Sequence, residues 1–522
     1  MWIEECDKTH KNCTNNDSIL PQRVLDVGSA RHQHLSLHVS SQQYAPYVAL
    51  SHCWGKHPVL QTTMANIQDN GKAISFQSLP RNFQDAVVIC RGIGIRYLWI
   101  DSLCIIQDDK SDWETQSSHM ETIYNNAYLV LAASQAANSM DGFLDRKEKT
   151  FPETPQLDSK NSLKIANLGN LNGTVSHIYC RKQNSGSSQQ HLHKIEEAPL
   201  NRRGWVLQEN ILARRLVHFT NSEILWECIE CLKCECMEID GGDLEESIQT
   251  TAGMVRNAQL TRARGYTVTS DLHRRWLHLI GRYKGLALTH DSDRLPALSG
   301  LARLWQSRGA GEYLAGIWKS HILESLLWVK EHQVSCKRLN GYMAPSWSPF
   351  SVGYVDDGTS IRRPAFTYPG SMGFIMVLEA AELLEGQCSA AGNGPMGAVQ
   401  DGFITLKCHM GTVRVEGNEG IYSADSLLEP YEGPPPFHPG ICGVVNWDCP
   451  DKDVFQRDVS LILLGYSNDS SDSGYTTSVL VMVLMPLGTI PDIYRRVGLL
   501  CTPQKDLRKF VEGAGEQVVT IV

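Results

Sequence analysis

Polar side chains follow an apolar run in the stretch RYLWIDSLCIIQDDKSDWE, which spans residues 96–114. The run breaks at Asp101, and a thiol (Cys104), an amide (Gln107) and further acids come directly after it. Ligands of parallel sheets bind beyond the carboxyl ends of the strands, so this cluster suits a site. We expect Asp101 to be a catalytic residue and Cys104 and Gln107 to contact a ligand. The alternative for Asp101 is a cap of the local turn, since Asp accepts backbone N–H bonds readily.

A second polar group ends the apolar run in PYVALSHCWG, residues 46–55. Ser51, His52 and Cys53 have the residue types of a nucleophile with a histidine base. Adjacent residues on a strand point to opposite faces, however, so Ser51 and His52 cannot easily face each other. We therefore disfavour nucleophilic catalysis and expect Ser51 and Trp54 to be ligand contacts. Packing in the core is the alternative for Trp54.

A third group lies in NRRGWVLQENILARRL, residues 201–216. Trp205 and Glu209 are four residues apart, about one helical turn. A carboxylate suits an oxocarbenium-like transition state, so Glu209 is the second catalytic candidate. Its expected ligand-binding neighbours are Trp205, Gln208 and Arg203. The alternative is a surface ion pair between Glu209 and Arg202 or Arg203.

Four cysteines crowd the stretch WECIECLKCEC, at positions 228, 231, 234 and 236. Two-residue gaps suit thiolate ligands of tetrahedral zinc, and Cys6, His10 and Cys13 near the start of the chain could complete such a site. The last gap holds a single residue, and four ligands on so short a loop would be cramped. We therefore expect no metal and interpret these residues as reduced structural thiols.

Strand and helix patterns alternate around the first two groups. Apolar runs at 47–50, 97–100 and 127–134 predict buried strands. Apolar residues at helical spacing begin at Phe83 and predict a helix there. A second helix should begin at Ser111, with Glu114 completing a capping box. This alternation predicts a parallel sheet with helices on its faces, and another strand begins at Leu216.

The length of 522 residues exceeds what one ordinary core holds. We expect an N-terminal arm at 1–45 and an α/β domain at 46–235, in which 140–200 is a variable insertion. A helical region at 245–335 and a β-rich C-terminal region at 336–522 should follow.

Composition narrows the class of protein. The chain is 42% hydrophobic and 20% charged, as in a globular protein, and its net charge of −9 argues against binding to nucleic acid. We find no apolar run long enough to span a membrane and no signal-peptide pattern. The sixteen cysteines are therefore expected to be reduced and the protein cytoplasmic. Walker A and H-E-x-x-H motifs are absent.

Three separated stretches also carry a family resemblance. YVALSHCWG, IRYLWIDSLCIIQDDKSDW and NRRGWVLQENILARRL resemble, in order and spacing, the signature blocks of the fungal heterokaryon-incompatibility (HET) domain. DRLPALSGLA, YLAGIW and APSWS resemble segments that often follow it, although Ser348-Pro349-Phe350 stands where another Trp is usual. The resemblance implies non-self recognition between fungal strains that ends in regulated cell death. Self-association or another incompatibility protein would be the partner.

The HET domain has been likened to the TIR fold, and TIR-type enzymes that cleave NAD carry a similar Trp-to-Glu spacing. The resemblance therefore implies a TIR-like domain with a small-molecule ligand, NAD as its substrate and Glu209 as the carboxylate that orients the ribose. Two alternatives stay open. The protein could serve a fungal secondary-metabolite pathway as an enzyme or accessory protein. It could also be a non-catalytic interaction module whose signature blocks build only the core.

Overall fold

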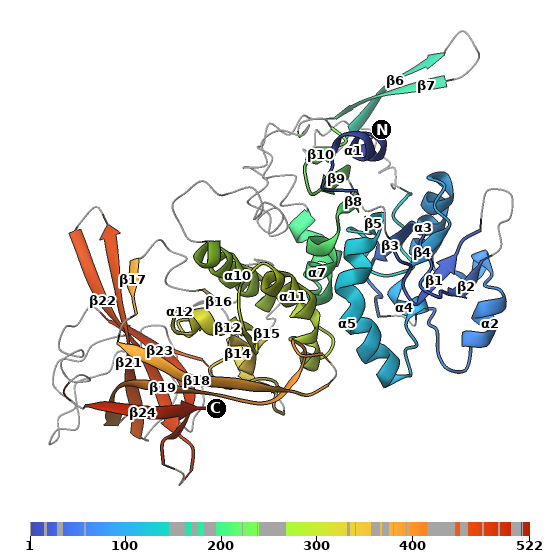
Figure 1. The fold of residues 1–522 in the computed structure, drawn as a ribbon. Coiled ribbons are helices and arrows are strands. Elements are labelled where there is room, and N and C mark those ends of the chain that lie inside the picture. Colours follow the sequence, from blue (N-terminus) through green and yellow to red (C-terminus); the bar gives the residue numbers. More distant parts are fainter. Residues whose placement is uncertain are drawn as a thin grey trace. The chain divides into compact units, whose positions relative to one another are not determined.

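The computed structural model describes residues 2–14, 18–28, 35–56, 59–145, 162–169, 175–181, 195–221, 223–236, 239, 268–330, 335–339, 341–355, 366–367, 375–378, 380–392, 394–414, 444–448, 458–471, 474–488, 491–502, 513 and 515–522. The chain divides into two compact units (Figure 1). The first comprises 1–113, 122–202 and 209–257, and the second comprises 114–121, 203–208 and 258–522.

The first unit is built on an eight-stranded sheet in the order β10-β9-β8-β5-β3-β4-β1-β2. Its central strands are parallel: β3 (Tyr47–Ser51), β4 (Tyr97–Trp99), β5 (Leu129–Ala132) and β8 (Arg215–Phe219). Its outer strands are antiparallel: β1 (Arg23–Asp26), β2 (Ser36–Val39), β9 (Ile224–Cys228) and β10 (Leu232–Cys234). The predicted parallel sheet is confirmed for the four central strands. The sheet also includes β1 and β2, which lie in the segment expected to be an arm.

Hydrophobic side chains at strand and helix spacing explain these elements. Val48, Leu98 and Leu131 on neighbouring parallel strands are fully buried, as expected for a sheet covered on both faces. The remaining elements of this part of the chain are α1 (Trp2–Thr9), α2 (Ile67–Lys72), η1 (Phe76–Ser78), α3 (Arg81–Gly92), α4 (Asp101–Cys104), α5 (Lys110–Asn126), the hairpin β6 (Ser162–Gly169) and β7 (Val175–Arg181), η2 (Pro199–Arg202) and α7 (Gly204–Leu212).

The start of α5 differs from the prediction. Asp109 is the N-cap, and its side chain accepts hydrogen bonds from the backbone N–H groups of Ser111 and Asp112. The capping box expected from Ser111 and Glu114 is therefore wrong. Asp and Ser are comparable N-caps, so the backbone conformation decides between them, and Asp109 has the extended conformation that a cap requires.

Aromatic packing builds the helical part of the second unit. Trp276 in α10 (Val268–Lys284) lies 5.4 Å from Trp305 in α11 (Ser299–Ser307) and 5.2 Å from Trp318, measured between ring centroids. Each of these rings is fully buried. Short elements surround them: α12 (Ile322–Ser325), η4 (Asp291–Asp293), η5 (Pro296–Leu298), η6 (Lys319–His321), η7 (Pro349–Ser351), and the strand pairs β11 (Tyr313–Leu314) with β12 (Ile317–Trp318), β13 (Val329–Lys330) with β16 (Phe366–Thr367), and β14 (Ser335–Arg338) with β15 (Val352–Val355).

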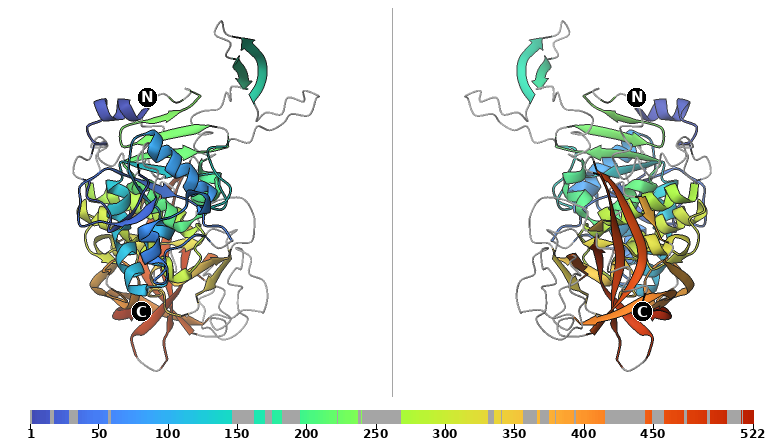
Figure 2. Two further views of the ribbon diagram at one scale, coloured as in Figure 1. Left: turned by 90° about the vertical axis from the view of Figure 1, so that its right-hand side faces the viewer. Right: turned by 90° about the vertical axis from the view of Figure 1, so that its left-hand side faces the viewer.

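The C-terminal region is β-rich, as predicted, and its strands are the orange to red ribbons of Figure 2. They are β17 (Ile375–Val377), β18 (Ala381–Ala390), β19 (Val399–Arg414), β20 (Val444–Trp447), β21 (Asp458–Ser471), β22 (Gly474–Pro486), β23 (Ile493–Thr502) and β24 (Glu516–Ile521). The pairings run from β21 through β22, β23, β24 and β19 and return to β21, so these strands form a closed circuit. Among the described residues of the whole chain, no helix has both the length and the apolar character needed to cross a membrane.

A buried arginine connects this sheet to the segment before it. Arg496 in β23 is 1% exposed, and its guanidinium binds both carboxylate oxygens of Asp448 at 3.0 and 3.1 Å. It also donates to the carbonyls of Leu326 and Trp328 and lies 3.7 Å from the centre of the Trp328 ring. These partners come from segments far apart in the chain, so the arginine gains them only when the segments come together.

We predict that Arg496→Ala destabilises the second unit by about 3–5 kcal/mol, because it removes the guanidinium that pairs with the buried Asp448 carboxylate. Thermal unfolding followed by calorimetry measures the loss. Lys407→Ala, which removes an exposed ion pair with Glu516 in the same unit, is the matched control and should leave the melting temperature nearly unchanged. Equal melting temperatures for the two variants would contradict the proposed role of the arginine.

Candidate functional site

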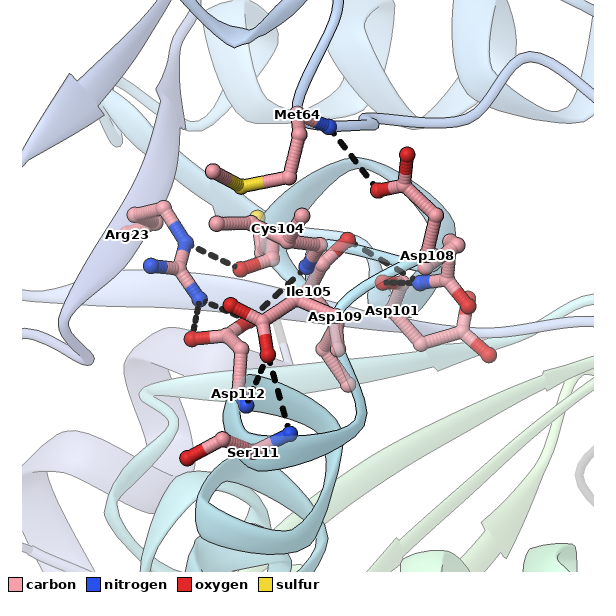
Figure 3. A network of polar contacts seen from close by, with 11 residues as sticks. Arg23, Met64, Asp101, Cys104, Ile105, Asp108, Asp109, Ser111 and Asp112 are labelled. Atoms are coloured by element: carbon pink, nitrogen blue, oxygen red, sulfur yellow. Dashed lines mark hydrogen bonds and ion pairs between the residues drawn. The ribbon is translucent and has the colours of Figure 1, made fainter.

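The acids after β4 mostly hold the backbone of their own loop. Asp108 accepts a hydrogen bond from the backbone N–H of Met64 at 2.8 Å, and Asp109 caps α5 (Figure 3). Asp112 binds the side chain of Arg23 in β1. Of these acids Asp109 is the cap, whereas Asp108 and Asp112 bind segments earlier in the chain, and Asp101 connects to another signature block.

The Arg23–Asp112 pair is the buried anchor of this loop. The Arg23 Nη2 atom lies 2.6 and 2.5 Å from the two carboxylate oxygens of Asp112, and the side chains are 4% and 10% exposed. Arg23 Nε donates to the carbonyl of Cys104 at 2.7 Å, and Asp112 accepts from the N–H of Ile106 at 2.8 Å. The loop from Cys104 to Asp112 is thus folded around one cation supplied by β1.

Asp101 joins the first two signature blocks. One carboxylate oxygen accepts from the N–H of Ser102 at 2.7 Å, and the other accepts from Trp54 Nε1 at 2.8 Å. His52 Nδ1 lies 3.8 Å from the Asp101 carboxylate, whose side chain is 24% exposed. Gly55, the residue after Trp54, has a φ of +82°, which favours glycine. Any other side chain there would clash with Asn138, because an added Cβ would lie 2.3 Å from the Asn138 Cβ. Asp101 is therefore fixed in place and still reaches solvent.

Glu209 joins the third block to the first. Its carboxylate accepts a hydrogen bond of 2.5 Å from Ser51 Oγ at the end of β3. Ser51 is fully buried and Glu209 is 5% exposed. Glu209 is therefore a buried residue at the carboxyl edge of the sheet, and the alternative of a surface ion pair does not describe its position.

Ser51 and His52 turn to different partners, as the alternation of a strand requires. Ser51 bonds Glu209, whereas the His52 ring packs edge-on against Phe83 with centroids 5.0 Å apart. The carboxylates of Glu209 and Asp101 therefore approach consecutive residues at the end of β3, Glu209 at Ser51 and Asp101 at His52. A Ser51–His52 nucleophile pair is not formed.

Cys104 and Gln107, the expected ligand contacts, have their polar groups turned to the protein backbone. The Cys104 side chain is 1% exposed, and burial raises the pKa of its thiol to about 12. The Gln107 amide donates to the carbonyls of Asp101 and Ile105 at 3.1 and 3.0 Å. Both residues brace the turn after Asp101, and a ligand role for them stays a prediction.

Arg203, Trp205 and Gln208 are grouped with the second compact unit. The half-buried Trp205 donates from Nε1 to Asp293 at 3.3 Å, and burial raises the pKa of that carboxyl. Gln208 is 1% exposed, with Nε2 3.8 Å from the sulfur of Met120, and Arg203 forms a backbone bridge with Ala287. The ligand contacts of these three residues stay predictions. The bond from the third signature block to the first is made by Glu209.

Sequence reasoning missed a buried relay beside the site. Ser134, directly after β5, has its Oγ 3.1 Å from His218 Nδ1, and His218 Nε2 lies 3.5 Å from the carboxylate of Glu227. These are the residue types of a nucleophile, a base and an acid, but Ser134 is 0% and His218 1% exposed. The serine that ends AYLVLAAS was the available signal. We interpret the relay as a structural network and assign no chemistry to it.

The cysteines of WECIECLKCEC separate into two groups. Cys228 lies with Cys6, His10 and Cys13, whereas Cys234 and Cys236 lie with Glu223. Hydrogen bonds from the thiols of Cys13, Cys231 and Cys6 lower the pKa of Cys228. Contacts with the thiols of Cys13 and Cys228, together with burial, raise the pKa of Cys6. Contact with the thiol of Cys228, together with burial, raises the pKa of Cys231.

The fold and the contacts define an α/β domain whose three signature blocks meet at the end of one central strand. Residues 47–209 match the family model described as Heterokaryon incompatibility protein (HET). The match covers less than half of the chain and runs from the start of β3 to Glu209. No curated protein matches the chain, and no solved structure does. The likeness to the TIR fold stays a prediction.

We predict that Asp112→Asn destabilises the first unit by about 3–5 kcal/mol, because the charge of Arg23 would remain buried without its counter-ion. Chemical denaturation measures the change. Asp69→Asn, which removes an exposed partner of Lys72 in the same unit, is the control and should change stability by less than about 0.5 kcal/mol. A loss for Asp112→Asn no larger than that of the control would show that the pair does not anchor the loop.

Cys104 should resist alkylation in the folded protein. The thiolate is the reactive form, and a pKa of about 12 leaves almost none of it at pH 8. Peptide mapping by mass spectrometry after iodoacetamide treatment should find Cys104 unmodified in native protein and modified after denaturation. Rapid native modification would mean that this loop opens, and Cys104 would regain its candidacy as a reactive group.

Proposed function

We propose that this protein acts in fungal heterokaryon incompatibility, and that its HET domain brings about cell death by cleaving NAD. The observation that carries the proposal is the hydrogen bond between Ser51 and Glu209. It joins residues 158 positions apart and puts a buried carboxylate at the carboxyl end of a central parallel strand. That edge is where parallel sheets bind their ligands.

A carboxylate in this position suits the breaking of an N-glycosidic bond. The bond between nicotinamide and ribose breaks with its electron pair going to nicotinamide, and positive charge develops on the ribose. Glu209 would stabilise that charge, and burial strengthens the interaction because the surroundings polarise less than water. Water then adds to the ribose and releases one proton, so the products are nicotinamide, ADP-ribose and H⁺.

Ser51 and Asp101 would have supporting roles. The Ser51 hydroxyl holds one oxygen of Glu209, which orients the other toward the ribose. Asp101 keeps 24% of its side chain exposed while Trp54 and Ser102 fix its carboxylate, so it can accept hydrogen bonds from ribose hydroxyls. A residue that is both fixed and accessible is suited to orienting a substrate.

Glu209→Gln tests the proposal, because the change preserves the side-chain volume and an oxygen that can accept from Ser51 while it removes the charge. We predict that it lowers NAD consumption at least tenfold, which corresponds to about 1.4 kcal/mol of lost transition-state stabilisation. Toxicity in a fungal host should fall with it. Wild type and variant are expressed at equal abundance, and NAD content and viability are followed together.

Asp108→Asn is the matched control, since it makes the same chemical change on the loop after β4, at an exposed residue that contacts the Met64 backbone. It should kill and consume NAD like the wild type. A Glu209→Gln variant as active as the wild type would end the carboxylate hypothesis. A wild type that kills without NAD loss would favour the non-catalytic interaction module, and one that does neither would favour the secondary-metabolite role.

A further inference from the structure

The start of the chain and the end of β9 bring four metal-binding side chains together. Cys6, His10, Cys13 and Cys228 each offer one ligand atom, and these atoms all lie within 4.8 Å of one another. Cys6 and His10 are four residues apart, and the N–H of His10 bonds the carbonyl of Cys6 at 3.0 Å, so both side chains lie on one side of the turn that ends α1. The N–H of Cys13 bonds the carbonyl of His10 at 3.3 Å and returns the chain to the cluster.

We propose that Cys6, His10, Cys13 and Cys228 bind one zinc ion. Three thiolates and one imidazole form a common set for tetrahedral structural zinc. Zinc–sulfur bonds of about 2.3 Å place the sulfur atoms of a tetrahedron about 3.8 Å apart. The distance from Cys228 Sγ to His10 Nδ1 is 3.4 Å, and the whole set lies within 4.8 Å, so the ligands need only small shifts to enclose the ion.

Cys231 supports the ligand set from outside it. Its backbone N–H donates to Cys228 Sγ at 3.3 Å, and its carbonyl accepts from the N–H of Cys228 at 2.9 Å. Its own sulfur is 3.5 Å from that of Cys228. An N–H group directed at a sulfur stabilises the thiolate that zinc requires, as outer-shell partners of metal ligands do. We therefore assign Cys231 a positioning role.

Burial and docking make the cluster a closed site. Cys6, Cys13 and Cys228 are 0%, 2% and 3% exposed. The N-terminal segment is held against the sheet edge by ion pairs from Lys233 to Glu5 and from Arg215 to Asp7, each 2.7 Å. The N–H of Asn12 bonds Glu230 at 2.8 Å. Four protein ligands without an open position are typical of structural zinc rather than catalytic zinc.

The expectation of metal-free thiols rested on the crowding of the four cysteines in WECIECLKCEC, although Cys6, His10 and Cys13 were considered as residues that could complete a site. The structure uses one of them and takes the other ligands from residues more than two hundred positions earlier, which removes the objection of a cramped loop. The remaining pair, Cys234 and Cys236, groups with Glu223, and we draw nothing from it. Metal content distinguishes the two views.

Elemental analysis of the full-length protein, purified without chelators from zinc-supplemented cells, should find about one equivalent of zinc. Cys13→Ser and Cys228→Ser should each retain less than about a fifth of that content. Cys90→Ala is the matched control, since Cys90 is buried in α3 outside the cluster, and it should retain the full equivalent. Zinc retained by Cys13→Ser and Cys228→Ser would overturn the assignment.

Wild-type protein alone gives a second readout that does not depend on whether variants fold. Chelation should lower the melting temperature by several degrees, and added zinc should restore it. Cobalt(II) added to the chelated protein should produce the visible absorption of a tetrahedral thiolate site. Absence of these bands, together with a melting temperature that neither chelator nor zinc changes, would overturn the proposal. Neither readout uses NAD or toxicity, so the outcome is independent of the proposed function.

Discussion

One buried cation holds the loop on which the candidate site depends. Arg23 reaches from β1, the strand beside β4, into the loop after β4 and binds a side-chain carboxylate and a backbone carbonyl there. A buried guanidinium must satisfy its charge and its N–H groups together, so the loop has little freedom to refold around it. Asp101 stands at the start of this loop. The contact between Arg23 and Asp112, at the other end of this loop, therefore helps to fix Asp101 beside Trp54.

The end of β3 is where the signature blocks meet. Ser51 and His52 are consecutive, and the alternation of the strand directs one to Glu209 and the other toward Asp101. A family signature made of three distant blocks is then one structural unit, in which a central strand connects two carboxylates. Only one carboxylate keeps substantial exposure, so the two cannot have the same role. In the proposed function, Asp101 would contact a substrate that arrives from solvent, and Glu209 would act on the substrate once it is enclosed.

Local pattern predicted the parts of this fold that depend on local physics. The central strands, α3 and the position of Asp101 at a strand end follow from periodicity and from where apolar runs stop. Partners far apart in the chain could not be predicted in this way. Arg23 gave no sign that it would bind Asp112, and the cysteine spacing suggested that Cys6 could join the later cysteines without showing that Cys228 is the one it meets. The predicted N-cap of α5 was wrong for a different reason. Asp109 and Ser111 are both good N-cap residues, and the backbone conformation decides which of them is the cap.

The packing of the first residues against the end of β9 also bears on how the chain is made. Cys13 leaves the ribosome 215 residues before Cys228, which at about 5–20 residues per second is roughly 10–40 s. During that interval α1 has no hairpin to dock on, and its thiols are exposed to oxidants and to chaperones. The segment that contains Cys6, His10 and Cys13 is thus synthesised well before the strand on which it packs.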